Sequence, residues 1–371
     1  MLGKVVLAGG GTAGHVNPLL ATATVLAKRG YDVEVLGTAQ GLESDLVPSA
    51  GFPLHVIEKV PFPRRPSPSI FTFPFRWRKA VNQCRLAMRD ADVVVGFGGY
   101  VSTPAYRAAR GAGVPIVIHE QNARPGLANK VGARYANVLA LTFANTPLNA
   151  RKGITQVTGL PLRPAIEELA LARQDTDGAR VARERGAKNL GVDPKKTTLL
   201  VTGGSLGALH LNDAMIGALG DLPGNVQVIH LTGKGKDAPV RSKVEKCSLG
   251  DRYLVLDYLT TMEDAFACAD LVVCRSGAGT VAEMTALSLP CVYVPLAIGN
   301  GEQKLNAHDH VASGGALLVD DASFNADTVR QKVFPLLTSP ELSAMATASA
   351  GLAKIDAASR LADLVVSQIA H

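Results

Sequence analysis

The sequence predicts an α/β protein with two doubly wound halves, each built on a parallel β-sheet with helices on both faces. Short apolar, β-branched runs alternate with longer helical segments, which is the pattern of a parallel sheet. Each half opens with a strand, a glycine-rich turn and a helix, and the pattern restarts at Thr197. The length of 371 residues agrees with two domains of ordinary size.

The first half begins with a predicted strand at Val5–Ala8, a helix at Val16–Arg29 and a second strand at Asp32–Leu36. Such short apolar runs are typical of strands that are buried on both faces of a sheet. Three more strands of this half are predicted, at residues 92–95, 115–118 and 138–141. Residues 1–160 are therefore predicted to form a first lobe.

The second half has predicted strands at residues 198–201, 226–231, 253–256, 271–274 and 291–294. We assign residues 197–340 to a second lobe. Residues 341–371 are predicted as C-terminal helices, which in two-lobed folds of this kind can return to the first lobe. Residues 161–196 are charged and poor in large apolar side chains, so they are predicted as a partly helical linker.

The composition excludes several classes of protein. Hydrophobic residues make up 47% and charged residues 19% of the chain, which argues against a disordered protein or a coiled coil. Five cysteines without a C-x-x-C pair argue against a disulfide framework or a zinc site, and they fit a reducing compartment. No run approaches the roughly 20 apolar residues of a spanning helix, so we expect a protein that does not cross a membrane.

The net charge of +6 is concentrated in one segment. Residues Lys59–Arg89 contain eight cations and no acid, so the rest of the chain is nearly balanced, unlike a generally basic nucleic-acid-binding protein. Aromatic residues are interleaved with these cations: Phe62, Phe71, Phe73, Phe75 and Trp77. Apolar anchors beside cations predict docking on an anionic membrane, with residues 75–88 as a helix. The alternative is a loop that folds onto its own lobe.

The first glycine-rich turn is Gly9–Gly14, between the first strand and the first helix. Such a turn brings backbone N–H groups and a helix N-terminus close to a ligand, which suits an anion. A nicotinamide dinucleotide would also need an acid at the end of the second strand, and Val35–Thr38 has none. His15 follows the turn, either as a general base or as a packing residue at the helix start.

Two further turns open helices in the second half. The turn at Gly203–Ala208 suits a phosphate, bound by its amides and by Ser205, or else simply a close strand–helix crossing. After Arg275–Gly277 a helix starts with small residues, and Glu283 lies one turn inside it. A carboxylate there suits the two hydroxyls of a ribose, although it also suits the positive end of the helix.

Metal-binding patterns are weak. The D-x-D pattern occurs at Asp90–Asp92, which leads into a strand, and at Asp175–Asp177, in the predicted linker. The ligand-type residues His308–His310 have no third partner at a sensible spacing. We therefore expect no required metal and no cofactor.

Six motifs follow one another along nearly the whole chain. They are Gly-Gly-Thr-Ala-Gly-His at residues 10–15, Gly98–Ser102, His119–Asn122, Gly203–Ser205, Arg275–Ala278 and Gln303–Ala307. Each is weak alone, but in this order and spacing they are specific, and the chain resembles the MurG family of glycosyltransferases. The resemblance implies the GT-B fold, with two Rossmann-like lobes and the active site in the cleft between them.

The resemblance implies an inverting transfer of GlcNAc from UDP-GlcNAc to the C4 hydroxyl of MurNAc in undecaprenyl-linked lipid I. The product would be lipid II for peptidoglycan synthesis. The resemblance also implies a peripheral protein on the cytoplasmic face of the bacterial cell membrane. The first lobe would face the acceptor and the anionic membrane, and the second lobe would bind the donor. No nucleic acid partner is implied.

The family's functional residues fall on matching positions of both lobes. His15 is the candidate base. Arg163 and Ser205 would face the diphosphate, Leu259 would contact the uracil through its backbone, and Glu283 would bind the ribose. Thr12, Ala13 and Gly14 would line the donor site from the first lobe, Asn122 would contact the donor sugar, and Gln303 would contact the GlcNAc hydroxyls. The other substrate-binding positions implied by the resemblance are Ala278, Gly279, Thr280, Val281 and Ala282.

The sequence departs from the family pattern at Leu206 and at Glu302, where Gln is common, and its linker at residues 167–191 looks longer than usual. Two other functions remain open. A sugar-nucleotide 2-epimerase shares the fold and would use carboxylates and histidines such as the pair His119–Glu120. A nucleotide-binding membrane regulator would keep the fold without catalysis.

Overall fold

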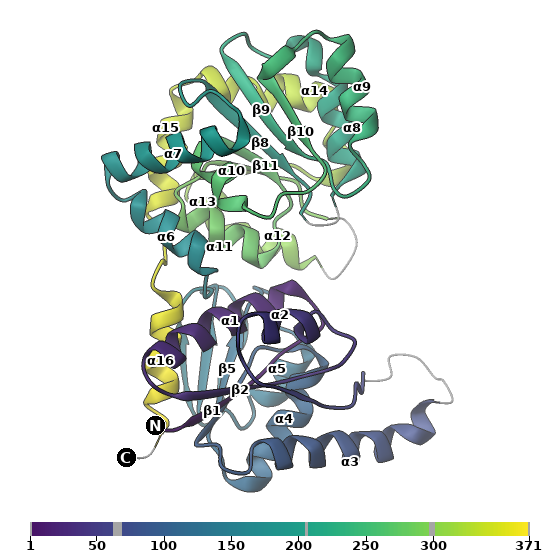
Figure 1. The fold of residues 1–371 in the computed structure, drawn as a ribbon, viewed down its shortest axis with the longest axis vertical. Coiled ribbons are helices and arrows are strands. Elements are labelled where there is room, and N and C mark those ends of the chain that lie inside the picture. Colours follow the sequence, from purple (N-terminus) through teal and green to yellow (C-terminus); the bar gives the residue numbers. More distant parts are fainter. Residues whose placement is uncertain (1, 62–68, 205–206, 297–300, 370–371) are drawn as a thin grey trace. The chain divides into compact units, whose positions relative to one another are not determined.

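The computed structural model describes residues 2–61, 69–204, 207–296 and 301–369 of the chain. The chain forms two compact units (Figure 1). Unit 1 comprises residues 1–163 and 356–371, and unit 2 comprises residues 164–355. Residues 164–196, which the sequence predicts as a linker, therefore belong to unit 2, and the last segment of the chain belongs to unit 1.

The sheet of unit 1 has seven strands in the order β3-β2-β1-β4-β5-β6-β7, and every neighbouring pair is parallel. The strands are β1 (Lys4–Ala8), β2 (Asp32–Gly37), β3 (Leu54–Val56), β4 (Val93–Gly96), β5 (Ile116–Glu120), β6 (Val138–Leu141) and β7 (Ile154–Val157). The predicted strands of this half are confirmed to within two residues. The two edge strands β3 and β7 were not predicted.

Helices cover both faces of this sheet (Figure 1). They are α1 (Ala13–Lys28), α2 (Glu43–Ser49), α3 (Ser69–Ala87), α4 (Gly99–Ala112), α5 (Leu127–Gly132) and α16 (Ala357–Val366). Alternate residues of β1 point to opposite cores. Leu7 packs with Leu26 of α1 and Leu361 of α16 on one face. Val6 packs with Met88 and with Tyr106 of α4 on the other.

The sheet of unit 2 has six parallel strands in the order β10-β9-β8-β11-β12-β13. They are β8 (Thr197–Thr202), β9 (Val226–Leu231), β10 (Tyr253–Leu256), β11 (Leu271–Cys274), β12 (Cys291–Tyr293) and β13 (Ala316–Leu318). The helices are α6 (Pro164–Ala172), α7 (Thr176–Leu190), α8 (Leu209–Gly217), α9 (Ala238–Lys246), α10 (Met262–Cys268), α11 (Ala278–Ala286), α12 (Glu302–Asn306), α13 (His308–Ala312), α14 (Ala326–Thr328) and α15 (Glu341–Ala350).

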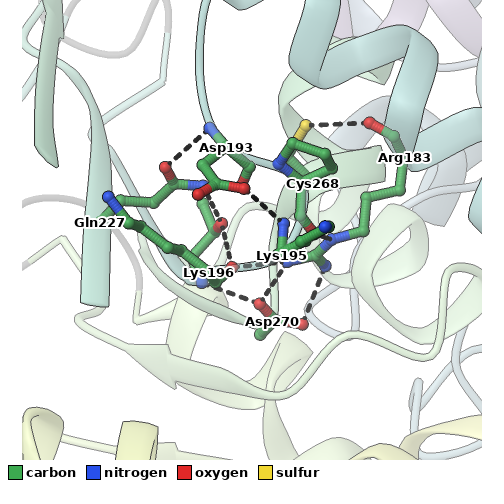
Figure 2. A network of polar contacts seen from close by, with 9 residues as sticks. Arg183, Asp193, Lys195, Lys196, Gln227, Cys268 and Asp270 are labelled. Carbon is green, nitrogen blue, oxygen red and sulfur yellow. Dashed lines mark hydrogen bonds and ion pairs between the residues drawn. The ribbon is translucent and has the colours of Figure 1, made fainter. Parts of the chain in front are cut away.

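Helix α7 is fixed to this sheet by one arginine (Figure 2). The Arg183 guanidinium makes two bonds to the Asp270 carboxylate, at 3.0 and 2.9 Å. It also donates to the backbone carbonyls of Pro194 and Lys196, just before β8. Asp270 in turn accepts the Thr198 N–H at 2.8 Å. Because these bonds join α7 to two strands of the sheet, the helix is part of the unit's framework.

Both sheets have the same topology around their first strand. The chain order reverses between β1 and β4 in unit 1, and between β8 and β11 in unit 2. In open α/β sheets, ligands bind outside the carboxyl ends of the strands at this switch point. The fold therefore marks one edge of each unit as the place where a ligand would bind.

Candidate functional site

The turn after β1 carries four of the predicted site residues to the switch point of unit 1. Thr12 precedes α1 with extended backbone angles, and its carbonyl accepts the His15 N–H at 3.0 Å. Thr12, Ala13 and Gly14 are exposed, and His15 is half-buried on the first turn of α1. The segment therefore presents exposed groups beside one partly enclosed imidazole.

The His15 ring is held on two sides. Its Nδ1 lies 2.9 Å from the Thr12 hydroxyl. Its Nε2 faces Gly98, where a Cβ would lie only 3.2 Å from that nitrogen. Burial lowers the pKa of His15, while the Gly10 backbone and the Glu43 carboxylate act in the opposite direction. The ring is therefore neutral at physiological pH and able to accept a proton.

The backbone amides of this turn are not all open to a ligand. The Gly11 N–H donates to Glu43 Oε2 at 2.9 Å. The expectation that this turn brings backbone N–H groups close to an anionic ligand does not hold at Gly11, because a carboxylate of the protein already accepts that hydrogen bond. Within the described residues, the hydrogen bonds of Glu43 go to Gly11 and Thr38, and not to the exposed residues at the start of α1.

Asn122 lies after β5, on a loop built around a buried acid. Glu120 accepts the N–H groups of Asn122 and Gly126 at 3.0 and 2.9 Å, and the Asn129 side chain at 2.9 Å. Burial raises the pKa of Glu120, and these hydrogen bonds oppose the shift. His119 is also buried, and its Nε2 bonds to the Gly159 carbonyl. The conformation of the loop that carries Asn122 is therefore fixed by hydrogen bonds to a buried side chain of unit 1.

In unit 2, the glycine turn after β8 is closely packed. A Cβ on Gly203 would meet the backbone of Ala208, and one on Gly207 would meet the Thr232 carbonyl. Gly204 and Gly207 have positive φ angles of 82° and 67°. The glycines thus allow a close crossing of strand and helix. Ser205, the predicted phosphate contact, lies outside the described residues, as does Leu206.

Helix α11 opens at the switch point of unit 2. Its first turns contain the predicted Ala278–Glu283 set, of which Ala278 and Val281 are buried and Gly279, Thr280, Ala282 and Glu283 are half-buried. Among the described residues, no heavy atom outside the helix start itself lies within 4 Å of the positions where Gly277 or Gly279 would carry a Cβ. The helix start therefore leaves room for a ligand against its backbone.

Arg275 fixes the segment that leads into α11. Its guanidinium donates to the Val294 carbonyl at 2.9 Å, at the end of β12, and forms an ion pair with Asp321. The same Asp321 carboxylate lies 3.4 Å from His210 Nδ1 on α8. These contacts join the ends of neighbouring strands around the switch point.

The remaining predicted residues lie at the same edge of their units. Leu259 follows β10 and is half-buried. Gln303 lies on α12, after β12, and its Oε1 accepts the Leu296 N–H at 2.9 Å. Arg163, the last residue of the first segment of unit 1, is half-buried. The structure thus places two groups of predicted residues, one at the carboxyl edge of each sheet.

Two groups that shape these edges were not predicted from the sequence. Glu43 reaches the first glycine turn from α2, and Asp321 holds Arg275. Gly10, Gly37 and Gly41 leave the space that the Glu43 side chain fills, but they lie in separate segments, so no local pattern in the sequence points to Glu43. No pattern points to Asp321 either.

The D-x-D patterns have other roles in the described chain. Asp92 accepts the Lys4 N–H at 2.7 Å, and Asp175 caps α7 by accepting the Gly178 N–H at 2.9 Å. Within the described residues, no three His, Cys, Asp or Glu side chains are grouped to hold a metal ion. No helix in the described ranges is long and apolar enough to cross a membrane.

Comparison with known proteins identifies the family. Two family models match, "Glycosyltransferase family 28 N-terminal domain" over residues 5–140 and "Glycosyltransferase family 28 C-terminal domain" over residues 198–361. A Bifidobacterium adolescentis protein named "UDP-N-acetylglucosamine--N-acetylmuramyl-(pentapeptide) pyrophosphoryl-undecaprenol N-acetylglucosamine transferase" is 52% identical over 91% of this chain and 90% of its own length. The crystal structure of Acinetobacter baumannii MurG covers 98% of this chain and 99% of its own, with a TM-score of 0.79 and 28% identity. The chain belongs to the MurG family.

The MurG family membership agrees with the architecture of the two units. Each family 28 domain model falls on one of the two parallel sheets. A solved putative UDP-N-acetylglucosamine 2-epimerase from Listeria monocytogenes also matches, with a TM-score of 0.67 over 96% of this chain and 94% of its own. At 16% identity this match shows only a shared fold. The chain is thus a MurG-family glycosyltransferase with two Rossmann-like domains.

Proposed function

We propose that this chain transfers GlcNAc from UDP-GlcNAc to the C4 hydroxyl of MurNAc in lipid I and so forms lipid II. The observation that carries the proposal is the 52% identity to a transferase of that name over almost the whole chain. The placement of two groups of matching residues at the switch points of both sheets supports it. Unit 1 provides the acceptor side and unit 2 the donor side.

Donor binding is assigned to the edge of unit 2 around α11. The helix N-terminus attracts the diphosphate, and Ala278–Glu283 wrap the nucleotide and its sugar. The Glu283 carboxylate accepts hydrogen bonds from the ribose hydroxyls. Leu259 contacts the uracil through its backbone, and Gln303 binds the GlcNAc hydroxyls. The open space around Gly277 and Gly279 supports this assignment.

His15 acts as the general base. The acceptor hydroxyl attacks C1 of GlcNAc on the face opposite to UDP, so the configuration at C1 inverts and the proton of the hydroxyl moves to His15. The lowered pKa of His15 keeps it neutral before this step. Charge developing on the leaving diphosphate is stabilised by the α11 N-terminus, Arg163 and Ser205, so the reaction requires no metal.

Incubation with radiolabelled UDP-GlcNAc and a lipid I analogue tests this proposal against its alternatives. Lipid-linked disaccharide and UDP support the transferase, and UDP-ManNAc would support an epimerase. Binding without turnover would support a regulator. The burial of His119 and Glu120 weighs against the epimerase, because both side chains are engaged inside unit 1 instead of facing a sugar.

We also propose that α3 holds unit 1 on the anionic cytoplasmic face of the cell membrane. The side chains of Phe71 and Phe75 are 83% and 79% exposed, one helical turn apart, and Leu86 on the same helix is 76% exposed. The opposite face buries Ala80 and Cys84 toward α4. Apolar groups exposed on one helix face suit insertion into the membrane interface.

The cations of α3 divide into two groups. Arg76 and Lys79 bond to Glu58 at 2.7 and 3.2 Å, which fixes the helix to the preceding segment and lowers the pKa of that carboxyl. Arg78 and Arg85 are exposed among the apolar residues. These exposed cations suit anionic lipid headgroups. Phe62, Arg64 and Arg65 lie outside the described residues.

The burial of the aromatic residues on α3 decides which variant tests membrane binding. Phe73 and Trp77 are half-buried and stack on each other at 5.9 Å, so their substitution would disturb α3 itself. The variant Phe71→Ser/Phe75→Ser is expected to bind phosphatidylglycerol vesicles at least about tenfold more weakly, because two apolar anchors are lost. UDP binding should be unchanged. The variant Ile154→Ser, which changes an exposed apolar residue on β7, is the control. Unchanged vesicle binding by the double variant would contradict the proposal.

A further inference from the structure

Glu43 is a fully buried carboxylate at the first residue of α2, with 0% exposure. Its Oε2 accepts the Gly11 N–H at 2.9 Å. Its Oε1 accepts the Thr38 N–H at 3.0 Å and the Thr38 hydroxyl at 2.9 Å. Burying a carboxylate is costly unless its oxygens are hydrogen-bonded, and here both of them are. The side chain thus joins the turn after β1 to the end of β2.

Three glycines make room for this carboxylate. A Cβ on Gly10, Gly37 or Gly41 would overlap the Glu43 side chain, and for Gly37 it would lie 2.5 Å from Cγ. These glycines belong to three separate segments, the first turn, the end of β2 and the loop before α2. Glycine at these three positions therefore makes room for the buried Glu43 side chain.

We propose that Glu43 is a positioning residue for the transfer reaction. Its carboxylate accepts the Gly11 N–H, a position where an anionic ligand would otherwise bind. This hydrogen bond fixes the turn that presents Thr12 and His15. Tyr100 supports the same turn, because its ring packs against Gly11, where a Cβ would lie 3.0 Å from it. This inference rests on the proposed function only through the role of His15.

Other charged or titratable groups near the turn do not replace Glu43. The Tyr100 hydroxyl lies 3.4 Å from Thr38 Oγ1, and Lys59 lies over the Tyr100 ring at 5.1 Å. Neither contacts the Gly11 amide in the described contacts. Glu43 is the carboxylate whose charge acts on His15, where it partly opposes the effect of burial.

The substitution Glu43→Gln tests this role. It keeps the size of the side chain but replaces one acceptor oxygen by an NH₂ group, so either Gly11 or Thr38 then faces a donor. We expect kcat to fall about 10- to 100-fold because the base is misplaced. The KM for UDP-GlcNAc should change less than kcat, because most of the assigned donor contacts lie in unit 2. The acid limb of kcat/KM should also move to lower pH, since a negative charge near His15 is lost.

Glu34→Gln is the matched control. Glu34 lies on the same sheet and pairs with Lys4 and His55, away from the turn. It should change neither kcat nor the pH profile. If Glu43→Gln does not fold, Glu43→Asp keeps the charge but shortens the reach to Gly11, and the same kinetic split is expected. A Glu43→Gln or Glu43→Asp enzyme with normal kcat, or with a KM change alone, would overturn the proposal.

Amide hydrogen exchange separates this inference from the proposed function. The Gly11 amide should exchange slowly in the unmodified protein and at least about tenfold faster in Glu43→Gln, because its acceptor is weakened. This measurement does not depend on transferase activity. If the chain transferred no GlcNAc, the proposed function would be wrong. The exchange result would still test whether Glu43 holds the Gly11 amide. Equally slow exchange in both proteins would overturn the positioning role.

Discussion

His15 is a histidine whose protonation is set by its neighbours more than by solvent. Burial lowers its pKa, and the Thr12 hydroxyl lies at Nδ1. This arrangement leaves Nε2 as the nitrogen that faces Gly98 and the switch point. Since an imidazole accepts a proton only in its neutral form, the shift extends the useful pH range of a base downward.

His15→Ala is expected to lower kcat about 100-fold or more while UDP binding is kept, because the loss affects proton transfer alone. In the unmodified protein, kcat/KM should fall as the pH drops through the pKa of His15, with a midpoint below about 6.5. Steady-state assays across pH check both points. His55→Asn changes a half-buried histidine of the same unit, which pairs with Glu34 away from the turn, and is the control. Near-normal turnover by His15→Ala would remove the assignment.

Glu283→Gln tests the ribose contact. Replacing a charged acceptor by an amide should weaken UDP-GlcNAc binding about 10- to 100-fold, because the ribose loses charge-assisted hydrogen bonds. Isothermal titration calorimetry measures the effect directly. Glu341→Gln is the control, since Glu341 is likewise an acid near the start of a helix of unit 2 but lies at the exposed start of α15. Equal affinities would assign Glu283 to helix stabilisation only.

Single residues differ in how far their roles can be predicted from sequence. His15 stands out because it follows a glycine turn between a strand and a helix. Glu43 does not, because an acid at a helix start is ordinary. Its role depends on folding that brings the turn after β1, the end of β2 and α2 together, and no local pattern encodes that meeting. The identity of the base and the donor contacts remain predictions.

At the scale of elements, the sequence of α7 marks where the helix begins and ends but has no apolar stripe along one face. Asp175 caps its start and Gly191, with a φ of 71°, ends it. Its buried residues are Ala182, Gly186 and Ala187. A Cβ on Gly186 would lie 2.6 Å from the Asp264 carbonyl, so the helix packs closely on α10 through small residues. A helix of this kind resembles a linker in its composition.

Arg183→Ala is expected to lower the free energy of unfolding by about 2 kcal/mol, because the partly buried Asp270 loses its partner and two carbonyls lose a donor. Urea unfolding followed by circular dichroism measures the change. Arg180→Ala on the same helix removes an exposed pair with Glu184 and should cost less than about 0.5 kcal/mol. Similar effects of both variants would contradict the role of Arg183.

The strands were predicted well where they are buried on both faces. The runs at β9 and β11 are buried at every position and have the predicted bounds, because most of their residues are Val, Ile or Leu. The edge strand β10 also has the predicted bounds, because all four of its residues are apolar or aromatic. The edge strands β3, β7 and β13 have only three or four residues. β3 and β7 are largely exposed or half-buried, and so neither a continuous nor an alternating apolar pattern marks them.

At the scale of the whole molecule, buried neutral histidines link stability to pH. Burial lowers the pKa of His119 to about 4, of His230 to about 3 and of His310 to about 4. Below about pH 6.5 the unfolded chain takes up protons that the folded chain excludes. Stability from these groups is therefore complete above that pH and is lost as the pH falls toward the folded values.

The free energy of unfolding is expected to fall between pH 6.5 and pH 5 by up to about 1.4 kcal/mol per pH unit for each such histidine. His310→Gln should reduce this slope, since it removes one of these groups from between Tyr293 and Ser349. The neighbouring His308→Gln is the control, because His308 is 63% exposed. Urea unfolding at several pH values measures the slopes. Identical slopes for both variants would contradict the assignment.

The return of α16 to unit 1 has a consequence for the order in which the protein folds during synthesis. Leu361, Val365 and Ile369 complete a core that begins with β1 and α1. Unit 1 is therefore unfinished while the ribosome translates all of unit 2, although its first strand emerges first. Unit 2 is continuous in sequence and has every strand of its sheet by then. We expect a released chain that ends at Ile355 to hold a protease-resistant unit 2 beside an N-terminal region that is still cleaved.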